Sequence, residues 1–289
     1  MAGDQTRFGI AVQPTWLREL HVEERLPEDA QILFTGCGTS YHAAQTAGSA
    51  IQAFELVLGR GTKAEHLVCV SHEGGTETTL AAARGFHGER WLVTGKPDSP
   101  LGELCEHVIV AAPAVEESWC HTAAYTTAVA ALAALCGEQV HWLEAAVEEQ
   151  LEAEPLPVSD HERWIVTGAG RDWPTAQEAT LKLREGAWVA AEAHHLEQLL
   201  HGHLSAVDES VRCFVLEGDV VGSRRAHQAA AALRELGCGV TLVPTSHPVV
   251  DIVPFQRLTV ALAEHRGADP DRIRRDHPRW ERAAEQHKG

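Results

Sequence analysis

Residues 164–208, WIVTGAGRDWPTAQEATLKLREGAWVAAEAHHLEQLLHGHLSAVD, decide the fold that this sequence predicts. A short apolar run ends at the glycines of 168–170, and a long segment with helical spacing follows it. Glu178, Lys182 and Glu185 are four and then three residues apart, so a helix places all three on one face. The stretch therefore predicts a strand, a glycine turn and a helix that presents one set of charged side chains.

The same pattern occurs earlier in the chain. Residues 32–38, ILFTGCG, match residues 164–170, WIVTGAG, because Thr-Gly-x-Gly follows a hydrophobic run in both. Ala-Gln then follows at the same offset, as Ala44-Gln45 and as Ala176-Gln177. An internal repeat fixes the architecture, so we expect two similar α/β halves.

Short apolar segments alternate with helical ones throughout the chain, which is typical of parallel sheets with helices on both faces. The helix expected near the N-terminus has Pro14 close to its first turn, where proline is tolerated. The helix at 118–135 is apolar nearly all round, which predicts that it is buried. The expected strands are 31–35, 67–70, 90–94, 107–111, 164–167, 212–216 and 240–243, and the expected helices are 8–26, 41–58, 77–86, 118–135, 174–192 and 223–236.

The composition of the segment 148–160, EEQLEAEPLPVSD, indicates a linker, because it is charged and contains two prolines. We therefore divide the chain into an N-terminal helix, a first half, this linker, a second half and a polar tail that ends in a short charged helix. The expected ranges are 1–28, 29–147, 148–160, 161–265 and 266–289.

The overall composition excludes several classes of protein. The net charge of −17 argues against nucleic acid and anionic membrane surfaces as partners. No window approaches eighteen consecutive apolar residues, and the N-terminus does not resemble a signal peptide. The seven cysteines form no CxxC pair, so we expect free thiols and a cytoplasmic protein.

Each glycine turn opens a helix, where backbone N–H groups and the helix dipole favour an anion. A bare GxG turn also serves plain strand–helix packing, and that alternative stays open. A dinucleotide fingerprint needs a third glycine, but Tyr41 and Trp173 occupy its positions, so we expect no nucleotide cofactor.

Residues 35–44, TGCGTSYHAA, and 71–80, SHEGGTETTL, resemble the SIS (sugar isomerase) domain. Residues 177–208 resemble the second SIS domain in the isomerase half of glucosamine-6-phosphate synthase, and the resemblance covers nearly the whole chain. It implies two SIS subdomains, each a flavodoxin-like parallel β-sheet flanked by helices. We expect no preceding glutaminase domain, because the chain is short and begins with Met rather than with an exposed cysteine. The resemblance also implies a homodimer with a shared active site that binds a sugar or sugar phosphate and needs no cofactor.

By this resemblance, Glu185 is the base that moves a proton between C1 and C2 of an open-chain sugar. His201 would assist ring opening, in the site of a partner subunit. Glu178 and Lys182 would hold substrate or position Glu185, although a solvated helix face with ion pairs explains the same spacing. The expected substrate-binding residues are Gly38, Thr39, Ser40, Ser71, His72, Glu73, Thr76 and Glu197.

The histidines at 194, 195, 201 and 203 do not have the HExxH spacing of zinc sites, so we expect no metal. Trp119 is the tryptophan that lies beside an expected site loop.

Three positions depart from the family pattern. Glu73 stands where a serine is expected, Ala123 replaces a lysine, and Arg272 to Arg275 replace a closing lysine segment. A carboxylate about 4 Å from a phosphate costs several kcal/mol at an effective dielectric constant near 20. Either Glu73 turns away, or the ligand has no phosphate at that position.

Three functions remain open on these grounds. The first is an isomerase, deaminase or deglycase of an amino-sugar or ketose phosphate that works through an enediol or enolamine. The second is a sugar-binding sensor without turnover. The third is an isomerase of an unphosphorylated amino-sugar whose ammonium pairs with Glu73.

Overall fold

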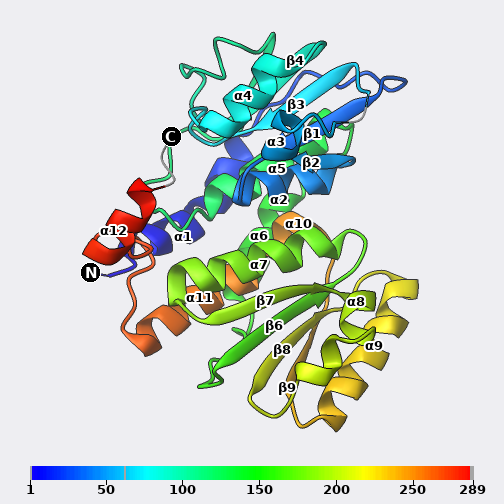
Figure 1. Cartoon of the computed structure of the whole chain (residues 1–289), viewed down its shortest axis with the longest axis vertical. Helices are drawn as coiled ribbons and strands as arrows, with labels where there is room; N and C mark the ends of the chain where they lie inside the picture. Colours follow the sequence, from blue (N-terminus) through cyan, green and yellow to red (C-terminus); the bar gives the residue numbers. More distant parts are fainter. Residues whose placement is uncertain (1, 62, 287–289) are drawn as a thin grey trace.

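The computed structural model describes residues 2–61 and 63–286 of the chain. Two parallel sheets lie at opposite ends of the molecule, and a layer of helices separates them (Figure 1). The predicted α/β class, with helices on both faces of parallel sheets, is confirmed. The first sheet contains β1 (Ile32–Gly36), β2 (Ala50–Gln52), β3 (His66–Val70), β4 (Glu89–Thr94) and β5 (His107–Val110), and the second contains β6 (Arg163–Gly168), β7 (Ala190–His195), β8 (Val211–Leu216) and β9 (Gly239–Val243).

The two sheets share one topology. The strand order is β2-β1-β3-β4-β5 in the first and β7-β6-β8-β9 in the second. The first of these is the flavodoxin-like order, in which the direction of winding reverses between the first and third strands. In each half the repeated Thr-Gly-x-Gly turn follows the strand at which the order reverses, so the sequence repeat is also a repeat of structure.

The helices form a middle layer and two outer layers (Figure 1). The outer layers pack on separate clusters of apolar side chains, one on each sheet. The middle layer contains α1 (Asp4–Glu19), α2 (Thr39–Ala47), α5 (Ala123–Leu135), α6 (Leu143–Glu152), α7 (Asp172–Ala187), α10 (Pro248–Asp251) and α11 (Val253–Arg266); α3 (Ala53–Val57) and α4 (Glu77–Gly85) cover the first sheet, α8 (Leu196–Leu200) and α9 (Val220–Glu235) cover the second, a 3₁₀ turn spans His203–Ala206, and α12 (Pro278–Glu285) lies in the tail.

Alternation along the strands explains this layering, because successive side chains point to opposite faces of a sheet. In β3, Leu67 faces the outer cluster and Val68 faces the central core. In β8, Phe214 belongs to that same central core. One continuous core therefore joins the two halves. All thirteen residues of α5 are buried in the structure, as its apolar composition predicts.

The helix expected at 8–26 ends at Glu19, and the one expected at 118–135 begins at Ala123. Two other expected helices end early because a strand follows each of them. The helix expected at 41–58 ends at Ala47, and Gly48 turns the chain into β2. The helix expected at 174–192 ends at Ala187, where Trp188 adopts a left-handed conformation with φ 57°. Both β2 and β7 are edge strands; β2 has only three residues, and β7 consists of alanine and polar residues without a β-branched side chain.

The segments at 143–152 and 248–266 are helical although no helix was expected there. The first five residues of the expected linker, 148–152, accordingly belong to α6. The tail contains the expected short helix, α12, and its last three residues, 287–289, lie outside the described part of the chain.

The N-terminal helix starts at Asp4, so the expectation that Pro14 lies near its first turn is wrong. Pro14 lies inside the helix, where proline lacks the N–H that bonds the carbonyl four residues earlier. The Nε2 of Gln13 donates to that carbonyl, the oxygen of Ile10, over 3.0 Å. The neighbouring side chain thus supplies the hydrogen bond that proline cannot make.

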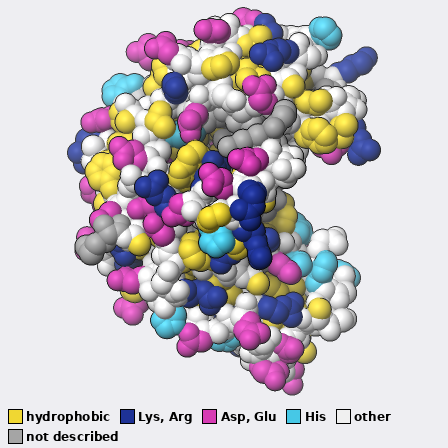
Figure 2. Space-filling view, turned by 60° about the vertical axis from the view of Figure 1, so that its left-hand side comes forward, with side chains coloured by type: hydrophobic (Ala, Val, Ile, Leu, Met, Phe, Trp, Pro, Cys, Tyr) yellow, Lys and Arg dark blue, Asp and Glu magenta, His cyan; other side chains and the backbone are white. Residues whose placement is uncertain are grey.

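A notch separates an upper and a lower lobe on one side of the molecule (Figure 2). Acidic side chains are spread over the face seen there, with basic ones between them, and do not form a single patch. Among the described residues, no helix has the length and apolar character needed to cross a membrane.

Candidate functional site

The expected site loops meet at the carboxyl edge of the first sheet. The turn after β1 and the loop after β3 lie where the strand order reverses, which is where open parallel sheets bind ligands. They enclose a cleft of about 420 Å³. The cleft is also lined by Glu185 from α7 of the second half and by Ile273 and Arg275 from the tail. Three distant parts of the chain therefore build it.

Glycines set the path of both loops. A Cβ on Gly36 would lie 2.7 Å from the carbonyl carbon of Ser40, so the turn closes only with glycine. Gly74 has a φ of 66°, and a Cβ there would lie 2.0 Å from the Ser99 hydroxyl. These turns place the expected ligand-binding residues Gly38, Thr39, Ser40, Ser71, His72, Glu73 and Thr76 in the cleft wall.

The charged triplet of α7 is buried. The side chains of Glu178 and Lys182 are 0% and 1% exposed, and that of Glu185 is 24% exposed. The Nζ of Lys182 lies 2.7 Å from Glu185 Oε2 and 3.4 Å from Glu178 Oε1. A solvated helix face is therefore excluded for Glu178 and Lys182. Only Glu185 presents its carboxylate to the cleft.

Glu178 joins the second half to the first. His42 Nδ1 donates to Glu178 Oε2 over 2.7 Å, and Thr39 Oγ1 donates to Glu178 Oε1 over 3.1 Å. Both partners lie on α2, next to the glycine turn. Burial alone would lower the pKa of Lys182, but Glu185 and Glu178 together raise it above its ordinary value. Lys182 thus remains a cation that holds the Glu185 carboxylate in place.

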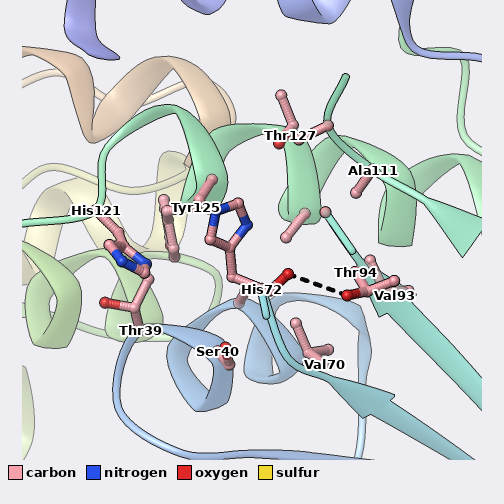
Figure 3. Close-up of a pocket in the computed structure, with 15 residues that line it drawn as sticks. Thr39, Ser40, Val70, His72, Val93, Thr94, Ala111, His121, Tyr125 and Thr127 are labelled. Carbon is pink, nitrogen blue, oxygen red and sulfur yellow. Dashed lines mark hydrogen bonds between the residues drawn. The ribbon is translucent and has the colours of Figure 1, made fainter. Parts of the chain in front are cut away.

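Two histidines stand at the inner wall of the cleft. His72 follows β3 and His121 precedes α5, and their ring centroids are 5.0 Å apart (Figure 3). A small cavity of about 20 Å³ lies beside them, with room for about one water molecule. The backbone N–H of Glu116 donates to His72 Nε2 over 2.9 Å, so neutral His72 carries its proton on Nδ1.

Burial lowers the pKa of His72 to about 4 and that of His121 to about 3, where Lys182 adds to the effect. Both rings are therefore uncharged at neutral pH. The other acidic and basic side chains in the cleft wall are Glu73, Glu185 and Arg275. His72 consequently offers no positive charge to offset Glu73.

Arg275 is a site residue that the sequence did not identify as one. Its guanidinium lies over the ring of Trp119, 3.7 Å from the ring centroid. The preceding Arg274 lies between two tryptophans, 4.3 Å from the centroid of Trp188 and 4.4 Å from that of Trp280. These stacks hold the tail against the cleft. The only sequence signals were the arginines of 272–275 and the position of Trp119.

The structure places two expected site residues elsewhere. Glu197 does not line the cleft, because it pairs with Arg225, whose Nη2 lies 2.9 Å from Glu197 Oε2. His201 lies 3.3 Å from Glu197 Oε2, and its side chain is 73% exposed. Within the described residues, no group of three or more histidine, cysteine or acidic side chains is placed to hold a metal.

The chain is similar in sequence to bacterial and archaeal aminotransferases. It is 26% identical to the isomerizing glutamine–fructose-6-phosphate aminotransferase of Methanothermobacter thermautotrophicus, over 89% of this chain and 52% of that protein. It is 24% identical to the enzyme of the same name from Bacillus subtilis strain 168, over 86% of this chain and 50% of that protein. The chain thus spans about half the length of these relatives. No family model matches it.

Solved structures show the same fold. The C-terminal domain of glucosamine-fructose-6-phosphate aminotransferase from Francisella tularensis superposes with a TM-score of 0.78 at 20% identity, covering 92% of this chain and 97% of that one. The glucosamine-6-phosphate deaminase of Thermotoga maritima gives 0.76 at 18% identity over 93% and 97%. The tagatose-6-phosphate ketose/aldose isomerase of Escherichia coli gives 0.76 at 17% identity over 94% and 95%.

Proposed function

We propose that this chain is a tandem SIS enzyme that moves a proton between C1 and C2 of an open-chain sugar derivative, as an isomerase or as a deaminase or deglycase. The observation that carries the proposal is the Glu185 carboxylate, which reaches the cleft while the buried Lys182 holds it at 2.7 Å. The names of the relatives and of the solved structures support the same substrate class, sugar phosphates.

The chemistry needs one base that removes a proton from one carbon and returns it to the next. For an isomerase, Glu185 takes the proton from the carbon beside the carbonyl group, the hydroxyl proton passes from one oxygen to the other through an enediol, and the protonated Glu185 delivers its proton to the neighbouring carbon. For a deaminase, the same transfer through an enolamine gives an imine, and water hydrolyses the imine with release of ammonia. Lys182 and Glu178 are positioning residues in this scheme. Lys182 fixes the Glu185 carboxylate, and Glu178 fixes Lys182 against the loop of the first half.

A sugar phosphate would bind with its phosphate at the hydroxyls of Ser40, Ser71 and Thr76. Arg275 would supply the positive charge, since His72 and His121 are neutral. Glu73 opposes a phosphate at this position, because it is exposed and belongs to the same cleft wall. That observation favours a second candidate, an unphosphorylated amino-sugar whose ammonium pairs with Glu73.

His201 takes part in ring opening only if another copy of the chain provides it, because in its own copy it lies outside the cleft. We therefore include a homodimer with shared active sites in the proposal. Size measurements in solution, combined with activity of mixed His201→Ala and Glu185→Gln dimers, test this part. Recovery of activity in the mixture supports a shared site.

The main experiment is proton exchange in D₂O, followed by NMR at C1 and C2. We expect wild-type protein to introduce deuterium into fructose 6-phosphate or glucosamine 6-phosphate, and Glu185→Gln to introduce none. Asp269→Asn is the matched control, since this acidic side chain lies outside the cleft. Unchanged exchange in Glu185→Gln would refute the base. Binding without any exchange in wild type would instead identify a sensor.

The ligand class is decided by thermal unfolding with matched pairs of phosphorylated and free sugars. A ligand at a hundred times its Kd adds about 2.7 kcal/mol to the free energy of unfolding. Stabilisation by sugar phosphates alone supports the first candidate. Stabilisation by free amino-sugars alone, lost in Glu73→Ser, supports the second and refutes a phosphorylated substrate.

A further inference from the structure

A second cleft lies at the matching position of the second sheet. The loops after β6, β8 and β9 enclose about 340 Å³ beside the point where the order of β6 and β8 reverses. Parallel sheets bind ligands outside the carboxyl ends of strands at such reversals. The internal repeat therefore gives the chain two positions of this kind, and only the first belongs to the proposed active site.

The wall of the second cleft is mainly acidic, whereas the wall of the first contains both acidic and basic side chains. The second wall contains four carboxylates, those of Asp172, Glu217, Asp219 and Asp251, and one cation, Arg171. Arg171 offsets them only in part: its charge lowers the pKa of Asp172, but its side chain is 65% exposed and its Nη2 lies 4.0 Å from Glu138 Oε2. A ligand that enters this cleft thus meets mainly acidic side chains, and burial raises the pKa of two of them, Asp172 and Asp251.

Two of these carboxylates already have partners in the chain. Glu217 accepts from the Ser223 hydroxyl over 3.1 Å and pairs with His227 at 2.8 Å. Asp219 caps α9 by accepting from two backbone N–H groups of its first turn. Neither needs a ligand.

Asp172 and Asp251 differ because they are buried, with exposures of 5% and 6%. Asp251 Oδ1 accepts from the Ser246 N–H over 2.7 Å. The Oδ2 of Asp172 has no partner at full hydrogen-bond geometry among the described residues, although the Thr245 hydroxyl and the Gly218 N–H lie near enough to its carboxyl group to lower its pKa, which burial raises. This oxygen lies 3.2 Å from the position of a Cβ built on Gly218, so it faces the loop of the opposite wall. A buried oxygen without a donor is costly, and a ligand can supply that donor.

The other residues of the cleft wall indicate which chemical group of a ligand would donate to Asp172. A metal ion is disfavoured, since the described residues contain no group of three or more ligands suited to one. An ammonium group donates three hydrogen bonds and carries the charge that two carboxylates attract. The hydroxyls of Thr245 and Ser246 also line the cleft and suit a ligand with hydroxyl groups. The volume fits a molecule of monosaccharide size.

We propose that the second cleft is a binding site for a small polyhydroxylated primary amine, whose ammonium lies against Asp172 and Asp251. The geometry is independent of the proposed function, because no residue of this wall lines the first cleft. The chain would then hold two ligands, one at each reversal of strand order.

Titration calorimetry with glucosamine, and with glucose as the neutral analogue, tests this. We expect glucosamine to bind wild type and a Glu73→Gln/Glu185→Gln variant alike, at least tenfold more weakly to Asp172→Asn, and glucose not to bind. Affinity unchanged by Asp172→Asn would overturn the proposal, as would absence of glucosamine binding. Loss of binding only in the Glu73→Gln/Glu185→Gln variant would also overturn it, since the ligand would then lie in the first cleft.

Two further measurements guard against a folding artefact. Thr245→Val keeps both carboxylates and removes one hydroxyl, so we expect severalfold weaker binding with an unchanged circular dichroism spectrum. Asp172→Asn should retain the proton exchange of the first cleft in D₂O, because its side chain takes no part in that site. A failure of the exchange assay in wild type would refute the proposed function and leave the glucosamine result unaffected.

Discussion

Replacement of Lys182 by methionine tests whether the buried triplet of α7 is a linked network. The substitution keeps an unbranched side chain, one heavy atom shorter, and removes the cation between Glu178 and Glu185. Glu178 is fully buried, so it would be left as a buried carboxylate with only His42 and Thr39 as partners. Breaking a buried pair in this way costs about 3–5 kcal/mol.

The assay is equilibrium unfolding in urea, followed by tryptophan fluorescence and circular dichroism. We expect Lys182→Met to lose about 3–5 kcal/mol and Glu178→Gln about 1–3 kcal/mol, because in the second variant Lys182 still pairs with Glu185. The double variant has no unpaired buried charge at these positions, so it should lose less than the sum. Arg18→Met, which removes an exposed ion pair with Glu144, is the control and should leave the midpoint unchanged.

A loss below about 1 kcal/mol in Lys182→Met, or strict additivity in the double variant, would refute the network. In that case the Glu185 carboxylate would need another explanation for its position. The rate of proton exchange in D₂O should fall more in Lys182→Met than in Glu178→Gln, because loss of Lys182 misplaces the Glu185 carboxylate. The pH profile of the remaining activity in Lys182→Met should also shift.

Three further predictions concern pH, the glycine turn and the tail. Burial raises the pKa of Asp251 to about 7, so between about pH 4 and pH 7 the folded state binds more protons than the unfolded state, and wild type loses stability as the pH rises. The urea midpoint of Asp251→Asn should therefore gain on that of wild type over this interval. A difference between the two midpoints that stays constant with pH would contradict this. Gly36→Ala should cost about 1–3 kcal/mol of unfolding free energy, because its Cβ meets backbone, whereas Gly75→Ala, with open space around it, should be nearly neutral. Trp280→Ala removes one of the rings that hold Arg274, so amide exchange in 272–276 should accelerate while that of α5 stays unchanged.

Much of the fold could be predicted because the core strands have a strong local pattern. The repeat at 32–38 and 164–170 gave the two halves, and the apolar runs gave the central strands of each sheet. The edge strand β2 was missed because it is only three residues long, and β7 was missed because alanine and polar residues continue a helical pattern just as well. Only Gly48 marked the end of α2, and a single glycine is a weak signal.

The site was partly predictable for a similar reason. Glycine turns and their hydroxyl residues are local in sequence, so they could be placed at one edge of a sheet. The stack of Arg275 on Trp119 joins residues far apart in the chain, and no local pattern identifies such a contact. The burial of Lys182 was likewise hidden, because spacing alone does not distinguish a buried charged face from a solvated one.

The shared core bears on whether either half of the chain can exist without the other. A tandem repeat invites the view that each half is a module that could be moved, swapped or expressed by itself. Here α5 belongs to the first half in sequence, yet every one of its residues is buried in a layer completed by helices of both halves. We therefore expect a fragment that ended at residue 160 to expose this apolar helix to water and to be prone to aggregation. Because both copies contribute to this one core, we expect them to unfold together in a single transition.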